Sequence, residues 1–147
     1  MKLLSGFIMA FVIIGGINAQ SGSDKEGIEK ACMGYIEGFY EGDSLKIIEN
    51  VSPTLTKFGY WKNEASGEYK GAGYMTFDQA VDYVNSVRTK KNFAKPDAPK
   101  KVEVLDILNH IAVAKVTAWW GKDYVLLSKT GDKWMIDQVL WEGPLGK

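Results

Sequence analysis

Alternating apolar and polar positions dominate the last third of the chain. Four runs rich in Val, Ile, Thr, Trp and Tyr show this alternation, and they cover residues 101–108, 111–120, 123–130 and 133–141. The runs are separated by two-residue turn signals, which are Asn109-His110, Gly121-Lys122 and Gly131-Asp132. Alternation interrupted by turn pairs predicts antiparallel strands joined by hairpins. The pattern therefore predicts a four-stranded meander over residues 101–141.

Two-residue turns fix which side chains share a face of the predicted sheet. One of the two predicted faces mixes aromatic side chains with the charged residues Asp106, Lys115 and Asp137. A bulge at residues 130–132 would exchange the two faces of the last strand. The other predicted face is nearly all apolar, and its row of alanines leaves room for a helix. Its members are Leu105, Ile107, Ala112, Ala114, Val116, Ala118, Trp120, Val125, Leu127, Trp134, Ile136 and Leu140.

Helical spacing of apolar residues appears three times before the meander, over residues 23–41, 44–51 and 77–90. Capping-box patterns open the first helix at residues 23–26 and the third at 76–79. Glycines at 34 and 38 cost a helix about 1 kcal/mol each, so we expect close backbone approach there, most simply to the sheet.

Residues 54–62 and 68–75 alternate as a first hairpin between the second and third helices. The full order is then helix, helix, hairpin, helix and four strands. This order predicts an α+β fold, in which three helices of the N-terminal half pack on one face of a curved antiparallel sheet.

The first nineteen residues have the composition of a secretory signal peptide, with Lys2, an apolar run through Ile17 and a small residue at Ala19. A transmembrane anchor is the alternative, but the apolar stretch is shorter than the roughly 20 residues of a span. We therefore expect export to the periplasm or the medium, cleavage after Ala19, no membrane span after cleavage, and one domain over residues 20–147.

Composition narrows the possible chemistry. Eighteen basic residues balance eighteen acidic ones, which argues against a nucleic-acid partner. Cys32 is the single cysteine, and its apolar helical setting predicts a buried hydrophobe rather than a nucleophile. His110 is the single histidine, and its turn position predicts exposure. One Cys and one His give no zinc site of ordinary spacing, so we expect neither metal nor cofactor.

Three stretches in this order of elements carry a family resemblance: residues 38–43 (GFYEGD), 104–115 (VLDILNHIAVAK) and 131–136 (GDKWMI). They resemble the putative lumazine-binding family of the nuclear-transport-factor-2-like superfamily. The resemblance implies a cone of curved sheet lined by three helices.

Enzymes of that superfamily, such as ketosteroid isomerases and scytalone dehydratases, place an Asp base, a Tyr donor or a His–Asp pair inside the cone. Tyr35 is the residue here most similar to the Tyr donor of the isomerases. The matching Asp is missing, because residues 52–56 (SPTLT) contain no acid.

Two sets of residues are candidates for function. If the protein is an enzyme, Tyr35 and a partly buried Asp106 or Asp137 would carry acid–base chemistry; otherwise the mid-strand charges belong to a solvated or oligomer-forming outer face. If it is a binding module, we expect Tyr35, Trp61, Trp119 and Trp141 to line the cone mouth and stack on a flat ligand.

Our leading hypothesis is an exported, non-catalytic accessory module that binds a small aromatic or heteroaromatic ligand, such as a pterin or flavin, in a cone-shaped pocket. The alternative is a metal-independent isomerase, dehydratase or cyclase that uses acid–base residues in the cone. A third reading is a purely structural homodimer formed through the sheet.

Overall fold

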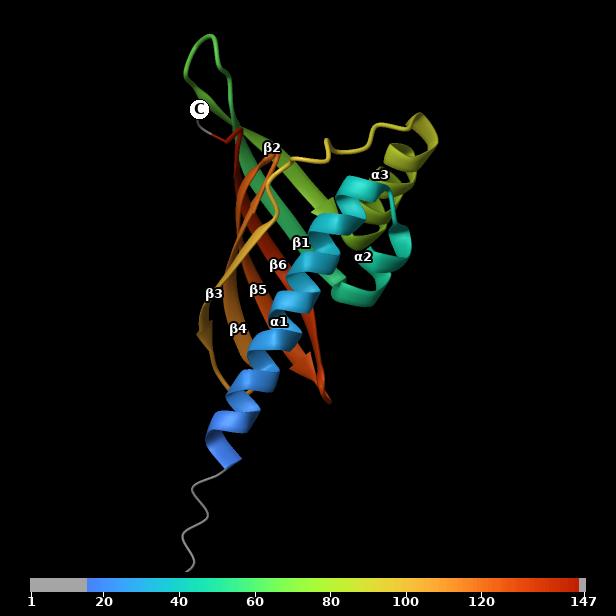
Figure 1. Cartoon of the computed structure of the whole chain (residues 1–147). Coiled ribbons are helices and arrows are strands. Elements are labelled where there is room, and N and C mark those ends of the chain that lie inside the picture. Colours follow the sequence, from blue (N-terminus) through green and yellow to red (C-terminus); the bar gives the residue numbers. More distant parts are fainter. Residues whose placement is uncertain (1–15, 146–147) are drawn as a thin grey trace, which may run out of the picture.

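The computed structural model describes residues 16–145 of the chain, and across them it shows three helices and one curved, six-stranded sheet (Figure 1). Residues 1–15, and with them most of the predicted signal peptide, lie outside the described residues. No helix within 16–145 combines the length and apolarity needed to cross a bilayer. The elements are α1 (Gly16–Glu41), α2 (Ser44–Asn50), β1 (Val51–Lys62), β2 (Tyr69–Thr76), α3 (Phe77–Lys90), β3 (Lys101–Ile107), β4 (Ile111–Ala118), β5 (Gly121–Thr130) and β6 (Lys133–Gly143).

The sheet has the strand order β2-β1-β6-β5-β4-β3. The predicted hairpin is β1–β2, and the predicted meander is β3 to β6. These neighbours pair antiparallel, whereas β1 and β6 run parallel, so the sheet is mixed. The predicted α+β architecture is confirmed. Hairpin signals report only on strands adjacent in sequence, which is why they do not reveal the β1–β6 pair.

Helix α1 crosses the sheet lengthwise, with α2 and α3 beside its C-terminal end (Figure 1). The alanine row of β4 lies beneath the helices, because Ala112, Ala114, Val116 and Ala118 are all buried. Gly34 and Gly38 of α1 do not serve the close approach to the sheet that we expected. A side chain at position 34 or 38 would instead collide with the side chains of Asn50 and Ile47 in α2.

The second hairpin turn differs from the prediction by two residues. Ala118 pairs with Gly121, so Trp119 and Trp120 form the turn and Gly121 begins β5. Gly121 has a φ of 152°, and a Cβ there would overlap the carbonyl oxygen of Glu142. The glycine therefore serves close packing of β5 against β6 rather than a turn.

A bulge does exchange the faces of β6, but it lies further along the strand than predicted. Leu126 pairs with Gln138 and Leu127 with Ile136, which leaves Asp137 as the extra residue. Val139 consequently enters the core, and Leu140 is 52% exposed. A similar shift around Leu105 in β3 leaves that residue half exposed, so both leucines were assigned to the wrong face.

The two capping boxes have different outcomes. The box at Thr76 and Gln79 is present at the start of α3. The predicted box at residues 23–26 is wrong, because α1 begins at Gly16 and continues through it. Asp24 instead accepts hydrogen bonds from Lys129 Nζ at 2.6 Å and Trp134 Nε1 at 3.0 Å, which ties α1 to the sheet.

Candidate functional site

A buried lysine lies at the centre of the cone. Lys57 is in β1 and faces inward with Leu55 and Gly59, the residues two positions on either side of it. Its Nζ donates a hydrogen bond to Tyr35 Oη of α1 at 2.6 Å and lies 3.6 Å from Asp123 Oδ2 of β5. Three elements distant in sequence thus bring an amine, a phenol and a carboxylate together.

The carboxylate of Asp123 is fully buried, with 0% exposure, and is well satisfied. Oδ2 accepts the Tyr35 hydroxyl at 2.8 Å, and Oδ1 accepts Trp120 Nε1 at 2.8 Å. A buried charge is tolerated when hydrogen bonds and an opposite charge compensate it. We call Tyr35, Lys57, Trp120 and Asp123 the pocket cluster.

Burial controls the proton affinities of the cluster. Loss of solvent raises the pKa of Tyr35 well above its ordinary value, and the charge of Asp123 and its hydrogen bond add to this. Loss of solvent also lowers the pKa of Lys57, although Asp123 opposes that change. Nearby Cys32 is buried, and its thiol pKa rises to about 12, so the prediction of a buried residue is confirmed.

Aromatic side chains surround the amino end of Lys57. Its Nζ lies 5.3 Å from the ring centre of Trp141 and 5.5 Å from that of Trp120. Rings at this distance stabilise a cation through their negative faces. The hollow in front of Nζ, which we call the aromatic pocket, has a volume of about 220 Å³ and is lined by Phe39, Lys57, Trp61, Met75, Tyr83, Trp119, Trp120 and Trp141.

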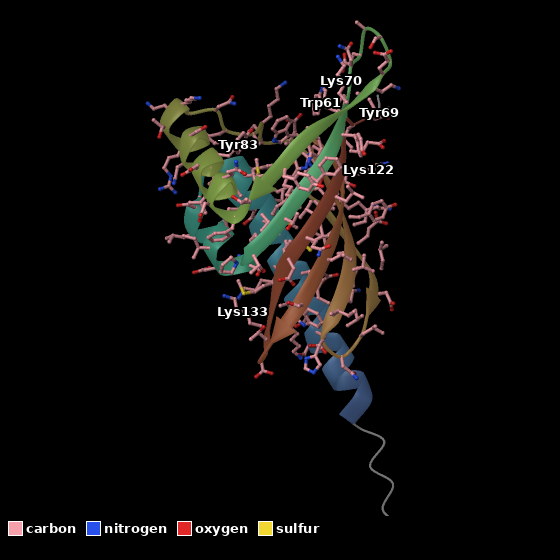
Figure 2. The ribbon with its side chains drawn as sticks, turned by 180° about the vertical axis from the view of Figure 1, so that it is seen from behind. Trp61, Tyr69, Lys70, Tyr83, Lys122 and Lys133 are labelled. Atoms are coloured by element: carbon pink, nitrogen blue, oxygen red, sulfur yellow. The ribbon has the colours of Figure 1, made fainter. Side chains whose placement is uncertain are left out.

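The four predicted ligand-binding residues lie at this place. Trp61, Trp119 and Trp141 line the aromatic pocket, and Tyr35 lies behind it, joined to Lys57. In Figure 2, Trp61 on β1 and Tyr83 on α3 lie toward the same end of the molecule. The structure brings these residues together, and their role in binding stays a prediction.

The two predicted candidate acids lie elsewhere. Asp106 and Asp137 line a separate hollow together with exposed Ile111 and Leu126, on the face of the sheet turned away from α1. Lys115 lies on that face too, where it pairs with Glu103 at 3.0 Å. The expectation that one of these aspartates would be the only acid available inside the cone is therefore wrong, because Asp123 occupies that place.

The two charged residues inside the cone, Lys57 and Asp123, were not identified from the sequence. Asp123 alternates in step with buried Val125 and Leu127, and Lys57 in step with buried Leu55, so strand parity could have placed both inside. Asp123 directly follows the turn predicted at residues 121–122, so it was not recognised as an inward-facing strand residue. His110, by contrast, is exposed as expected.

A second hollow adjoins the aromatic pocket. It has a volume of about 610 Å³ and shares the side chains of Phe39, Tyr83 and Trp119 with the pocket. Residues 92–95 and 97–99, between α3 and β3, form its other wall. Across residues 16–145, no group of three His, Cys, Asp or Glu side chains lies close enough to hold a metal ion.

Comparison with solved structures identifies the fold. An NTF2-like protein of unknown function from Shewanella baltica OS155 is 20% identical with a TM-score of 0.60, and the match covers 82% of this chain and 93% of that one. An NTF2-like protein of unknown function from Methylobacillus flagellatus KT is 22% identical with a TM-score of 0.60, covering 81% and 90%. The β subunit of a putative aromatic-ring-hydroxylating dioxygenase from Novosphingobium aromaticivorans is 7% identical with a TM-score of 0.58, covering 86% and 93%.

Sequence comparison identifies the family. A search of curated proteins finds no match. A family model described as putative lumazine-binding matches residues 23–142, which is most of the chain. The chain therefore belongs to the putative lumazine-binding family and has an NTF2-like fold.

Proposed function

We propose that the aromatic pocket binds a small planar heteroaromatic ligand and that the protein is a non-catalytic binding module. The observation that carries this proposal is the lining of the pocket, which contains four of the chain's five tryptophans. Indole rings offer flat apolar surface for stacking, and each adds an N–H at its edge. A gathering of this kind around one hollow is typical of a site for a flat ligand.

The size of the pocket limits the ligand. Its volume of about 220 Å³ is below the roughly 300–1,000 Å³ of sites for drug-sized molecules. A compact fused-ring system suits this space, and substituents can extend into the adjoining hollow. The description of the family supports the same class of ligand, because lumazine is a bicyclic heteroaromatic compound.

The position of the acid–base groups favours binding over catalysis. Tyr35 and Asp123 are both fully buried and absent from the pocket lining, so only Lys57 of the three can touch a ligand. Asp123 already accepts two hydrogen bonds, which leaves it poorly placed to take a proton from a substrate.

The test is a titration of the protein with lumazine while tryptophan emission is followed. We expect saturable quenching, because four indoles lie at the site. Trp141→Leu should weaken binding, and Trp134→Phe is the matched control because Trp134 lies outside the pocket lining. Emission that changes only linearly with ligand, as with a simple absorber, would contradict the proposal.

One observation favours the catalytic alternative. Tyr35 is a hydrogen-bond bridge between Lys57 and Asp123, and such a chain could pass a proton during an isomerisation, dehydration or cyclisation. Incubation with lumazine and related heterocycles, followed by mass spectrometry and chromatography of the small molecules, tests it. Turnover by the wild type that disappears in Tyr35→Phe would replace binding by catalysis as the function.

The cellular location follows from the N-terminal pattern. We propose that the protein is exported to the periplasm or the medium after cleavage behind Ala19, as the charged start and apolar run at residues 2–17 indicate. The family match begins at residue 23, downstream of this segment. Intact-mass measurement on the protein from its native host should give Gln20 as the first residue, and a cytoplasmic form that retains Met1 would contradict export.

We propose that the outer face of the sheet, turned away from α1, is the interface of a homodimer. Large apolar side chains there are about half exposed, at Ile111, Tyr124, Leu126 and Leu140. Contiguous exposed apolar surface of this kind usually marks an interface. Sedimentation at several concentrations tests this, with Leu126→Lys as the disrupting variant. Wild type that sediments as a monomer at all concentrations would contradict the proposal.

A further inference from the structure

Lys57 has donor capacity that residues 16–145 do not use. An amino group of lysine in its charged form carries three N–H donors. Nζ donates one hydrogen bond, to Tyr35, and its separation of 3.6 Å from Asp123 Oδ2 is an ion-pair contact rather than a hydrogen bond. The rest of its surroundings are the rings of Phe39, Trp120 and Trp141 and the hollow itself. Because these three rings also line the aromatic pocket, Nζ lies at its wall, and among residues 16–145 its only hydrogen-bond acceptor is Tyr35 Oη.

The charge of the site selects the acceptor that can meet this donor. Lys57 and Asp123 carry opposite charges, so together they have no net charge. An anionic ligand would leave one uncompensated negative charge among buried groups, and such a charge is costly at low dielectric. A neutral oxygen acceptor adds a hydrogen bond to Nζ without that penalty.

We propose that the ligand of the aromatic pocket is a neutral fused-ring molecule with a carbonyl group at its buried end, whose oxygen accepts a hydrogen bond from Lys57 Nζ. This inference rests on the proposed function, since it specifies the ligand of the same site. The carbonyl points toward β1 and β5, and the rings lie between Trp61, Trp119 and Trp141. The opposite edge of the ligand faces Tyr83, so the adjoining hollow accommodates substituents there.

Three bicyclic probes of similar size separate the contributions of ring stacking, the carbonyl and charge. Coumarin is neutral and has a ring carbonyl, naphthalene has no polar atom, and 2-naphthoate carries a negative charge. Equilibrium dialysis against the wild-type protein should show coumarin bound at least tenfold more tightly than either of the other two. Equal binding of coumarin and naphthalene, or tightest binding of 2-naphthoate, would overturn the proposal.

Variants assign the preference to Lys57. Lys57→Met keeps the length of the side chain and removes the donor, but it leaves Asp123 buried without its cation. The double variant with Asp123→Asn avoids this, because an Asn oxygen can still accept Trp120 Nε1 while its amide donates to Tyr35 Oη. We expect both variants to bind coumarin and naphthalene equally. A coumarin preference that persists in the double variant would overturn the proposal.

A comparison with lumazine distinguishes failure of the carbonyl anchor from failure of the proposed function. Lumazine and the three probes are compared on the same wild-type sample. If lumazine quenches tryptophan emission saturably while coumarin and naphthalene bind alike, the pocket function stands and the carbonyl anchor is wrong. If neither lumazine nor any probe binds, the proposed function itself is wrong.

Discussion

Two buried clusters that each contain an aspartate, a lysine and a tryptophan connect α1 to the sheet, and they differ in what lies in front of them. In the pocket cluster, Asp123 accepts Trp120 Nε1 and lies beside Lys57. In what we call the end cluster, Asp24 accepts Trp134 Nε1 and Lys129 Nζ. Both lysines are about nine-tenths buried, and both lie near the ring of an indole.

The clusters differ in how directly each lysine is paired with its aspartate. Lys129 donates directly to its aspartate at 2.6 Å, so its charge is satisfied within the protein. Lys57 is held 3.6 Å from its aspartate by the intervening Tyr35 hydroxyl and faces an aromatic hollow. Residue types alone therefore do not mark a site; an incompletely used donor beside an apolar hollow does.

The largest expected effect is on the free energy of unfolding, which should fall more when the pocket cluster is disrupted than when the end cluster is. Asp123→Ala leaves the Tyr35 hydroxyl and Trp120 Nε1 without their acceptor and Lys57 without its counter-ion, and breaking a buried pair costs about 3–5 kcal/mol. Asp24 keeps 10% of its side chain exposed, whereas the Asp123 side chain is fully buried, so we expect a smaller loss of about 1–3 kcal/mol for Asp24→Ala. Urea unfolding of both variants measures the two values. A larger loss for Asp24→Ala would invert the comparison.

Alkaline pH should act on the pocket cluster through Cys32, which lies beside Asp123. Burial, then the charge of Asp123, raises the pKa of its thiol from 9.0 to about 12. The folded pKa is above the unfolded one, so this stabilisation is complete below pH 9 and is lost as the pH rises toward 12. By pH 11 the wild type should lose about 2 kcal/mol that Cys32→Ala does not lose.

Urea unfolding at pH 8, 9.5 and 11 gives the slope of stability against pH for each protein. Comparing slopes removes the constant penalty of the smaller side chain. Parallel slopes would show that Cys32 does not experience the burial described here.

A smaller effect separates the clusters by ligand binding. Trp61→Leu removes one stacking surface and should weaken lumazine binding by about fivefold, or about 1 kcal/mol. Lys129→Met alters the end cluster and should leave the affinity unchanged, even though it lowers stability. Fluorescence titration measures both. An equal loss of affinity in the two variants would mean that the clusters are not independent.

The smallest effect is expected on the outer face of the sheet. Asp137→Asn changes a bulge residue far from the pocket lining, so stability and lumazine affinity should both stay within measurement error. Thermal unfolding and the same titration provide the check. Loss of affinity in this variant would restore Asp137 as a site residue and break the distinction between the two faces.

The sequence predicts the elements well and the pocket only in part. Turn pairs and strand parity place the alanine row of β4 correctly beneath α1, and aromatic content points to Trp61, Trp119 and Trp141. Lys57 and Asp123 escape prediction because charged side chains are rarely buried, although both alternate in step with buried apolar positions of their strands.

Other features depend on long-range contacts that no local pattern encodes. The bulge at Asp137 arises where β5 and β6 pair, and Gly121 is fixed by the backbone of Glu142. The approach of Gly34 to Asn50 depends on how α2 packs on α1. Propensity and periodicity describe single elements, so they leave such contacts undetermined.

The parallel pairing of β1 with β6 also sets the order in which the molecule can fold. Val51 of β1 is joined to Ile136 of β6, and a loop of that length must close before the two strands meet. The strand that unites both halves of the sheet is also the last one synthesised. Contacts so distant in sequence slow folding, so a growing chain stays incompletely folded until residues 133–143 emerge. The two halves of the sheet therefore stay unjoined for most of the chain's synthesis.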